Sequence, residues 1–287
     1  MTIQIITDSA CDMPKSIKER YHIQILPLYV TQDDTLYRDG VDIHPTEIYE
    51  SMARGVVYKT SQIPYADYFA CFKDYAEKNQ PALYLCFSSG LSGTYQTARL
   101  ARRDVLELYP DAQIEVYDTK AVLGGLGLLV EQVGAAASMG ADMESLLKLA
   151  AKCTRHVHHI FTVSDLQYLY RGGRLNRGTA MVGNALKIRP FLVVDEKGEL
   201  GMIDKARGEK RLLKKMIDFM GSHSYDIKRQ QIYICQAACQ PMVDEFIKMV
   251  GKAFDNDNIE VMPMAPIIGT HTGPGTLTVF FFDKKIN

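Results

Sequence analysis

The 287-residue sequence has no apolar run long enough to cross a membrane, which takes about 20 residues in a helix. Its most apolar stretch, "AVLGGLGLLVEQVGAAA", is interrupted by Glu131 and Gln132. The first residues, "MTIQIITDSACD", lack a basic segment followed by a long apolar one, so we predict no signal peptide. We therefore expect a cytoplasmic protein without a membrane span. A transient contact with a membrane surface stays open.

The sequence also has no excess of charge of one sign. It contains 33 Lys and Arg residues against 34 Asp and Glu residues, so we expect no basic field that attracts nucleic acid. Its six cysteines include no Cys-x-x-Cys pair, and several lie within apolar segments. We therefore expect reduced thiols rather than a disulfide framework.

The first half alternates apolar segments with helical patterns. Four segments rich in β-forming residues predict strands, at 3–7, 23–30, 82–87 and 113–118. Between the last two, residues at a spacing of three or four predict one face of a helix: Tyr95, Ala98, Ala101, Val105 and Leu108. This alternation predicts a doubly wound, mostly parallel α/β sheet.

The pattern changes near residue 156. Residues 189–208 predict an antiparallel hairpin that turns at Glu196-Lys197-Gly198. Helical patterns at 208–220 and 241–253 then alternate with the strands "QIYICQA" and "LTVFFF". We predict an N-terminal α/β domain at 1–154, whose last helix is capped by Asp142, and a C-terminal α/β domain with a mixed or antiparallel sheet at 155–287.

The loop "SSGLSG" follows a predicted strand and leads into a helix that begins near Thr94. In a doubly wound fold, ligands gather beyond the carboxyl ends of the strands. A helix amino terminus offers free N–H groups, and Gly93 lets the backbone approach a ligand closely. We therefore expect the loop to hold a carboxylate or phosphate, unless Ser92 only caps the helix. The loop lacks the lysine of a nucleotide-binding P-loop.

Three further polar segments are candidate parts of the same site. Thr60 and Ser61 in "KTSQIP" precede a helical stretch, and their alternative role is a capping turn. His271 lies between two threonines in a glycine-rich loop, "IIGTHTGPG", where it could donate a hydrogen bond to an anion. Asp8 ends the first predicted strand; it could act as a nucleophile, but we favour a role in ordering the loops by accepting backbone hydrogen bonds.

Two clusters suggest other chemistry. The segment "YRGGRLNRG" brings together Arg171, Arg174 and Arg177, which could bind carboxylate or phosphate, form internal ion pairs or face a partner. In "HVHHI", His156 and His158 would share a face of a strand, but no Cys or carboxylate nearby in the sequence completes a ligand set. We therefore expect no metal and no cofactor.

Taken together, the motifs resemble the DegV family, the fatty-acid-binding proteins of bacteria. The resemblance covers essentially the whole chain, with the motifs in order: "TDSACDMP", "PLYV", "KTSQ", "SSGLSGTY", "YDT", "YLYRGGRL", "GNALKIRPFL", "KARGEKR" and "GTHTGPGT". In many relatives a proline directly follows "KTSQ", whereas here Ile63 comes before Pro64. This departure concerns the path of the loop rather than its hydroxyl groups.

The resemblance implies two α/β domains with a long-chain fatty acid in a tunnel between them. It implies that Thr60, Ser92 and the Gly93 amide hold the carboxylate, with His271 in the same hydrogen-bond network and Ser61 adjacent. Some family members are binding subunits of bacterial fatty acid kinase, in which a separate ATP-dependent protein phosphorylates the bound acid. In that case Arg171 and Arg207 would face the kinase subunit.

Our leading hypothesis is a lipid-binding protein that is not itself an enzyme and that serves phospholipid metabolism by presenting its fatty acid to a kinase. One alternative is a stand-alone enzyme acting on a small acyl or phosphorylated substrate through Asp8 or His271. Another is a lipid carrier or sensor without a kinase. The sequence does not indicate acyl chain length, unsaturation or oligomeric state.

Overall fold

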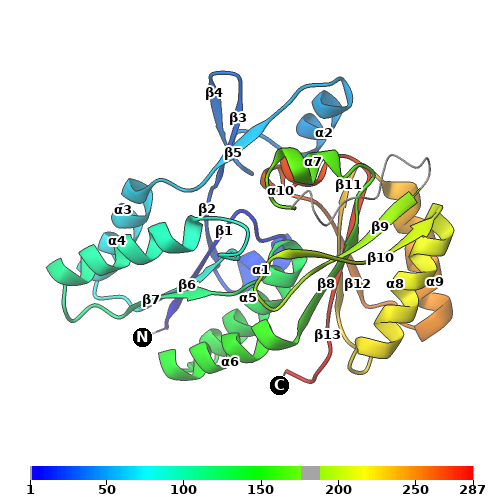
Figure 1. Cartoon of the computed structure of the whole chain (residues 1–287). Helices are drawn as coiled ribbons and strands as arrows, with labels where there is room; N and C mark the ends of the chain where they lie inside the picture. Colours follow the sequence, from blue (N-terminus) through cyan, green and yellow to red (C-terminus); the bar gives the residue numbers. More distant parts are fainter. Residues whose placement is uncertain (1, 176–187, 287) are drawn as a thin grey trace.

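The computed structural model describes residues 2–175 and 188–286, and within these ranges it contains three sheets (Figure 1). The first sheet is parallel, in the order β2-β1-β6-β7, as the alternating pattern predicts. Its strands are β1 (Gln4–Asp8), β2 (Gln24–Leu26), β6 (Ala82–Cys86) and β7 (Ile114–Asp118). Its helices are α1 (Lys15–Arg20), α3 (Tyr65–Glu77), α4 (Thr94–Leu108), α5 (Leu123–Ser138) and α6 (Met143–His156).

The predicted strand at 23–30 is divided in two. β2 ends at Leu26, and the next strand begins at Tyr29, after Pro27. Proline has no N–H to donate to a strand ladder, so it separates the two pieces. The second piece, β3 (Tyr29–Gln32), forms a small antiparallel sheet with β4 (Thr35–Arg38) and β5 (Lys59–Ser61). Helix α2 (Pro45–Ala53) lies between β4 and β5 in the chain, so this unit is an insertion at the carboxyl edge of the parallel sheet.

The third sheet is mixed and has the order β10-β9-β8-β13-β11-β12, in which only β11 and β12 are parallel. The predicted hairpin is present as β9 (Ile188–Val194) and β10 (Leu200–Arg207). The other strands are β8 (Val157–Thr162), β11 (Ile232–Ala237), β12 (Ile259–Pro263) and β13 (Thr276–Phe282). The helices of this half are α7 (Gln167–Arg171), α8 (Glu209–His223), α9 (Gln240–Phe254) and α10 (Pro266–Thr272).

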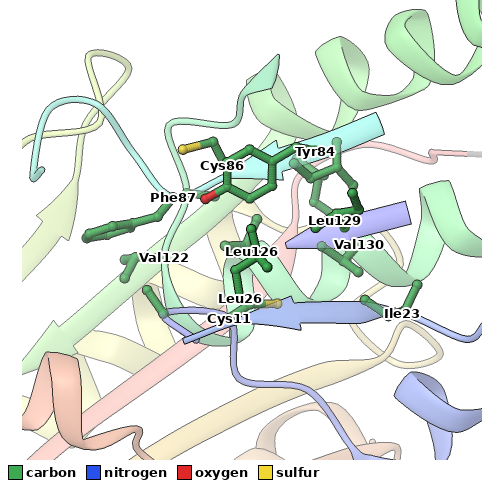
Figure 2. Close-up of a cluster of buried hydrophobic side chains, with 14 of the residues drawn as sticks. Cys11, Ile23, Leu26, Tyr84, Cys86, Phe87, Val122, Leu126, Leu129 and Val130 are labelled. Carbon is green, nitrogen blue, oxygen red and sulfur yellow. The ribbon is translucent and has the colours of Figure 1, made fainter. Parts of the chain in front are cut away.

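Helix α5 lies between the parallel sheet and the mixed sheet. Its residues Leu126, Leu129 and Val130 pack on the parallel sheet, as Figure 2 shows. The same core cluster includes Tyr233 and Phe280 of the mixed sheet. Gly124 and Gly125 make this approach possible, because a Cβ there would come within 2.6 Å of Phe280 and 2.1 Å of His159. Both sheets therefore share one apolar core.

Helices α8 and α9 cover the other face of the mixed sheet (Figure 1). Successive side chains of β13 point to opposite faces of this sheet. Val279 and Phe281 pack with the α8 and α9 cluster, whereas Phe280 faces α5. Among the helices that the structure describes, none is both long enough and apolar enough to cross a membrane.

Two local predictions have different outcomes. Asp142 caps α6, as predicted, by accepting the Ser145 N–H at 2.8 Å. On α4 the predicted face is correct for Ala98, Ala101 and Val105, which are buried, but wrong for Leu108, which is 62% exposed. Leu108 is the last residue of the helix, where the apolar stripe has turned away from the core.

Candidate functional site: a cavity with a polar end

One cavity lies where the three sheets meet. It is lined by the loops after β2 and β6, the amino-terminal end of α5, strand β5, the β9–β10 hairpin, helix α10 and the inner face of β8 and β13. The space between the lining atoms is about 770 Å³, including its open mouth.

Most of the lining is apolar, and it includes Leu28, Phe87, Leu123, Phe161, Leu169, Val194, Leu200, Ile267 and Phe280. Two polar residues in this part have their polar atoms occupied. The Thr278 hydroxyl donates to the Cys235 carbonyl at 2.9 Å, and His159 Nε2 accepts the Val122 N–H at 3.2 Å. Burial lowers the pKa of His159 to about 3, so its ring is neutral at physiological pH. This part of the cavity therefore suits a hydrocarbon chain.

The free polar groups of the lining are gathered together. Thr60 Oγ1 lies 2.7 Å from His271 Nε2, although the first residue is on β5 and the second on α10. The His271 ring also packs against Gly172, where a Cβ would lie 2.2 Å from Nδ1, so only glycine fits there. Burial, with a smaller contribution from the positive charge of Arg174, lowers the pKa of His271 to about 3. His271 is therefore a neutral hydrogen-bonding group rather than a cation at physiological pH.

Ser92 lines the cavity, and its hydroxyl accepts the Thr94 N–H at 3.2 Å at the start of α4. It is not the N-cap considered for it in the sequence, because that position belongs to Gly93. Its Oγ is 2.8 Å from the Thr94 Oγ1. Gly93, the cap residue of α4, lines an adjoining pocket rather than the cavity itself. The "SSGLSG" loop thus presents Ser92 to the cavity.

The "KTSQ" segment lies directly against this loop. Gln62 donates to the Thr97 hydroxyl at 3.0 Å, and a Cβ on Gly93 would lie 2.8 Å from Gln62 Oε1. Ser61 lines the cavity beside Thr60. Ile63, the residue at which the sequence departs from many relatives, is 1% exposed and packs in the core. The two hydroxyl-bearing turns are therefore adjacent, and His271 completes the group.

Arg174 is a site residue that the sequence analysis did not single out. It lines the cavity together with Ser92 and His271. Its guanidinium donates to the Leu91 carbonyl at 3.1 Å through Nε and to the Gly172 carbonyl at 2.6 Å through Nη1. The sequence placed it in an arginine cluster, but no local signal distinguished it from its neighbours. Arg177 of that cluster lies outside the described residues.

The two arginines that the resemblance assigned to a partner lie outside the cavity. Arg171 is exposed at the end of α7, with its guanidinium carbon 5.5 Å from the centre of the Tyr168 ring. Arg207 is exposed at the end of β10. Neither residue belongs to the cavity lining.

Asp8 lies in the interior and does not line the cavity. Its carboxylate accepts the Phe87 N–H at 2.9 Å, the Tyr84 hydroxyl at 2.7 Å and the Ala10 N–H at 3.1 Å. Burial raises its pKa to about 6, although these hydrogen bonds oppose the shift. These contacts join the end of β1 to the end of β6, which is the ordering role that we favoured.

Two further carboxyl groups, half-buried Asp12 and buried Asp39, contact the start of α10, a feature that the sequence did not indicate. Asp12 Oδ2 accepts the Ala265 N–H at 3.3 Å, and Asp39 Oδ1 accepts the Ile267 N–H at 3.4 Å. Burial raises the pKa of Asp12 to about 8 and that of Asp39 to about 7. Among the described residues, Asp39 Oδ2 has no hydrogen-bond partner. Both groups therefore keep their protons to a higher pH than in an unfolded chain.

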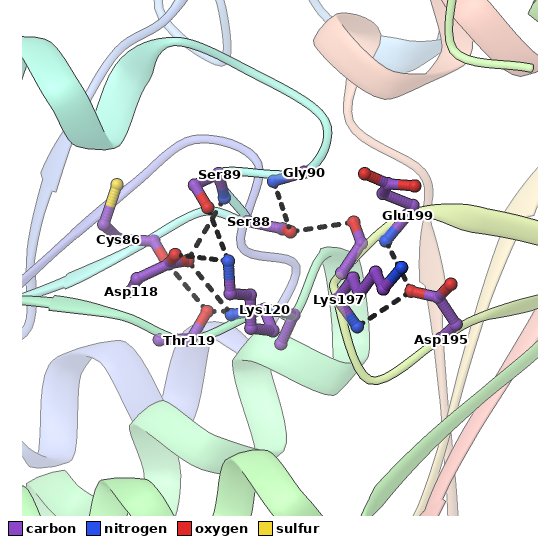
Figure 3. A network of polar contacts seen from close by, with 12 residues as sticks. Cys86, Ser88, Ser89, Gly90, Asp118, Thr119, Lys120, Asp195, Lys197 and Glu199 are labelled. Atoms are coloured by element: carbon purple, nitrogen blue, oxygen red, sulfur yellow. Dashed lines mark hydrogen bonds and ion pairs between the residues drawn. The ribbon is translucent and has the colours of Figure 1, made fainter.

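The SSGLSG loop (residues 88–93) also contacts the tip of the β9–β10 hairpin (Figure 3). The Ser88 hydroxyl donates to the Gly198 carbonyl at 2.8 Å. On the other side, the Asp118 carboxylate accepts the Ser89 N–H at 3.1 Å and pairs with Lys120 at 2.7 Å. The hairpin supplies Val194 and Leu200 to the cavity lining, so this contact helps to close the cavity.

The histidines of "HVHHI" meet a carboxylate that is distant in sequence. Asp283 lies 2.8 Å from His156 Nδ1 and 3.2 Å from His158 Nε2. The sequence around the histidines does not indicate this carboxylate, because β8 and β13 are neighbours only in the fold. Even so, no group of three or more metal-binding side chains with suitable geometry occurs in residues 2–175 and 188–286.

Comparison with known proteins identifies the family. A family model described as "Uncharacterised protein, DegV family" matches residues 2–284. A DegV domain-containing protein of Clostridium perfringens is 35% identical over 279 residues, which cover 96% of each chain. The chain belongs to the DegV family. A second DegV domain-containing protein, from Lactococcus lactis, is 32% identical over 99% of each chain.

Three solved structures have the same fold. A DegV family protein from Thermus thermophilus, described by its fatty acid binding, superposes with a TM-score of 0.88 at 29% identity, over 98% of this chain and 99% of that one. A stearic acid-binding protein from Eubacterium ventriosum has a TM-score of 0.86 at 27% identity, with 98% of each chain covered. A Thermotoga maritima protein, described as revealing a fatty acid binding function, has a TM-score of 0.83 at 30% identity, over 98% of this chain and 99% of that one.

Proposed function

We propose that this protein binds a long-chain fatty acid in the cavity and presents its carboxylate to a separate ATP-dependent kinase subunit. The observation that carries the first part is the distribution of polarity in one cavity. Thr60, Ser92, Arg174 and His271 are gathered together, with Ser61 beside Thr60, and most of the remaining lining is apolar. The structural neighbours described as fatty-acid-binding support the same ligand class.

The energetics favour an acid with a long tail. Burying about 14 methylene groups at about 0.8 kcal/mol each offers roughly 11 kcal/mol before the costs of ordering. The carboxylate is expensive to bury unless several donors meet it. Hydroxyl donors from Thr60 and Ser92, together with the positive charge of Arg174, supply that compensation.

His271 has a defined part in this arrangement. A neutral imidazole carries one N–H, and if this is on Nε2 it donates to Thr60 Oγ1. The Thr60 hydroxyl hydrogen is then free to donate to the fatty acid carboxylate. A bound acid would therefore favour the Nε2–H tautomer of His271.

In the proposed kinase reaction, a carboxylate oxygen of the bound acid attacks the γ-phosphorus of ATP. An acyl phosphate forms as the bond to the β-phosphate oxygen breaks, and ADP leaves. The nucleotide belongs to the kinase subunit, so this protein acts as the binding subunit and needs no cofactor of its own. Exposed Arg171 and Arg207 are the residues proposed to face that subunit.

Two measurements test the proposal. Organic extraction of the purified protein followed by mass spectrometry should release a long-chain fatty acid in about a one-to-one ratio. A clean extract, with no binding of added palmitate, would overturn the binding function. For the kinase part, acyl phosphate should form only when ATP and a fatty acid kinase subunit are both added. Formation by this protein alone would instead show a stand-alone enzyme.

A further inference from the structure

Helix α10 forms one wall of the cavity. It supplies four residues to the lining: Ile267, Ile268, His271 and Thr272. Of these, His271 is the residue that contacts Thr60. Because α10 has only seven residues, its position depends on contacts with the rest of the protein rather than on its own helical stability. A small displacement of α10 would therefore move part of the polar group and part of the apolar wall together.

Two carboxyl groups connect the start of α10 to the parallel sheet and to the small antiparallel sheet. Asp12, in the loop after β1, accepts the Ala265 N–H at 3.3 Å. Asp39, directly after β4, accepts the Ile267 N–H at 3.4 Å. Both distances are long for an N–H···O hydrogen bond, which is commonly about 2.9 to 3.0 Å. The start of the helix thus depends on weak contacts with side chains that can change their charge.

The surroundings of Asp39 do not suit a negative charge. Asp39 is 2% exposed, and its Oδ2 has no hydrogen-bond partner among the described residues. Neither Asp39 nor Asp12 forms an ion pair with a residue that the structure describes. Burial, with a smaller contribution from the charge of Asp8, raises the pKa of Asp39 to about 7. The titratable groups around the two carboxyls are acids or neutral at physiological pH: Asp8, Cys11, Tyr49, Cys235 and Cys239.

Ionisation of Asp39 favours a displaced α10. When the start of the helix moves away, water reaches the carboxyl group and its pKa returns toward the ordinary value of 3.8. The displaced arrangement then binds fewer protons than the arrangement in the structure, so its population grows as the pH rises from 3.8 to about 7 and is constant above that. Half-buried Asp12, whose pKa burial raises to about 8, acts in the same direction.

We propose that protonated Asp39, together with Asp12, positions α10 for ligand binding, and that loss of the proton displaces the start of α10 and speeds the release of the bound lipid. The inference rests on the proposed function and adds regulation by pH to it. Neither carboxyl group lines the cavity, so both act on the ligand through α10. They are positioning residues rather than ligand-binding ones.

The release rate of a fluorescent fatty acid, measured by stopped flow with excess palmitate, tests this coupling. Asn keeps a side-chain oxygen for the backbone N–H but cannot ionise, so Asp39→Asn and the Asp12→Asn/Asp39→Asn double variant represent the protonated state. Between pH 5.5 and 8.5 the rate should rise about 10-fold more in wild type than in the double variant, and about 5-fold more than in Asp39→Asn. The lipid head and His271 titrate in all three proteins.

Asp42→Asn is the matched control, because Asp42 is exposed in the same loop as Asp39. Hydrogen bonds from Arg38 lower the pKa of Asp42 to about 2, so it is ionised throughout the pH range used. Asp42→Asn should therefore show the wild-type pH dependence of release.

Hydrogen exchange of the ligand-free protein locates the displacement. At pH 8.5 the backbone amides of 264–272 should exchange about 5-fold faster in wild type than in the double variant. The amides of β6 serve as an internal reference and should exchange equally in both proteins.

The same pH dependence of release in wild type and the double variant would overturn the proposal. A pH dependence that Asp8→Asn alone removes would also overturn it, since Asp8 accepts its hydrogen bonds from Ala10, Tyr84 and Phe87 rather than from α10. Retained lipid binding at pH 5.5 shows that each variant is folded. Failure of the wild type to bind a fatty acid would overturn the proposed function, whereas the hydrogen-exchange result decides the link between Asp39 and α10 without a ligand.

Discussion

His271 Nε2 lies 2.7 Å from Thr60 Oγ1 across a separation of 211 residues in the chain. This contact joins α10 of the mixed-sheet half to the small antiparallel sheet, at the polar part of the cavity. Its two members come from segments that the sequence identified separately as candidate anion-binding loops. Their meeting makes the hydroxyl of Thr60 the first group to test.

Removing that hydroxyl should weaken fatty acid binding. A hydrogen bond to a charged group contributes about 1.5 to 3 kcal/mol, so Thr60→Val should raise the dissociation constant for palmitate about 10- to 100-fold. Thr60→Ser keeps the hydroxyl and should stay within about threefold of wild type. Displacement of a fluorescent fatty acid measures both. Equal affinity of Thr60→Val and wild type would show that Thr60 does not hold the carboxylate.

Ser92→Ala should reduce both binding and stability, because Ser92 lines the cavity and also accepts the Thr94 N–H. Loss of this hydrogen bond costs about 1 kcal/mol of unfolding free energy. Asp142→Ala is the matched control, since it removes a side-chain acceptor of a backbone N–H at the start of α6, outside the cavity. It should lower stability by a similar amount and leave palmitate affinity unchanged. The cavity role of Ser92 is wrong if both variants retain wild-type affinity.

Stability should fall as the pH rises through 7, because the pKa of Asp39 in the folded protein is about 7 and its ordinary value is 3.8. In the folded state Asp39 keeps a proton that the unfolded chain releases. The stabilisation that comes from this proton is complete below pH 3.8 and is lost as the pH rises through the folded pKa of about 7. Asp39→Asn removes this titration but keeps an oxygen for the Ile267 N–H.

Chemical denaturation at pH 5 and pH 8.5 measures the difference. The wild type should lose about 3 kcal/mol more unfolding free energy than Asp39→Asn between these values. His271 titrates in both proteins and cancels in the comparison, whereas the charge of Asp39 raises the pKa of Asp12, so part of the difference between the two proteins comes from Asp12. An identical pH dependence would mean that Asp39 is ionised across this range in the folded protein.

Gly198→Ala should weaken the contact between the β9–β10 hairpin and the SSGLSG loop. Gly198 has a φ of +77°, and a Cβ there would lie 2.0 Å from Ser88 Oγ. We expect palmitate to dissociate several times faster and stability to fall by about 1 to 3 kcal/mol. Gly201→Ala in the same hairpin is the control, since its Cβ would make only an ordinary 3.6 Å contact with Val193. Stopped-flow release of a fluorescent fatty acid should separate the two variants.

The sequence predicted what depends on local periodicity. Short-range patterns predicted three features that the structure confirms: the parallel sheet, the β9–β10 hairpin and the helix after the SSGLSG loop. The small sheet was missed because β3, β4 and β5 have three or four residues each and little apolar alternation. In such strands, pairing depends on tertiary contacts rather than on sequence pattern.

The candidate site residues also divide into those that the local sequence could identify and those that only the fold brings together. Thr60, Ser92 and His271 stand out by their glycine- and hydroxyl-rich surroundings, so the sequence could name them. Arg174 could not be chosen from its cluster, because only the fold shows which guanidinium is held against the Leu91 carbonyl. The contact of Asp12 with the Ala265 N–H spans 253 residues and involves a backbone group, which carries no sequence signal.

The position of α5 limits how a ligand can leave. Because the helix packs on both large sheets, swinging the two halves apart on a hinge would open a continuous hydrocarbon core to water. Exchange of a fatty acid is therefore expected to use small peripheral displacements, such as those of the hairpin tip or α10, rather than a clamshell motion. Fluorophores placed on the two halves would then report a constant separation while the lipid is loaded and unloaded.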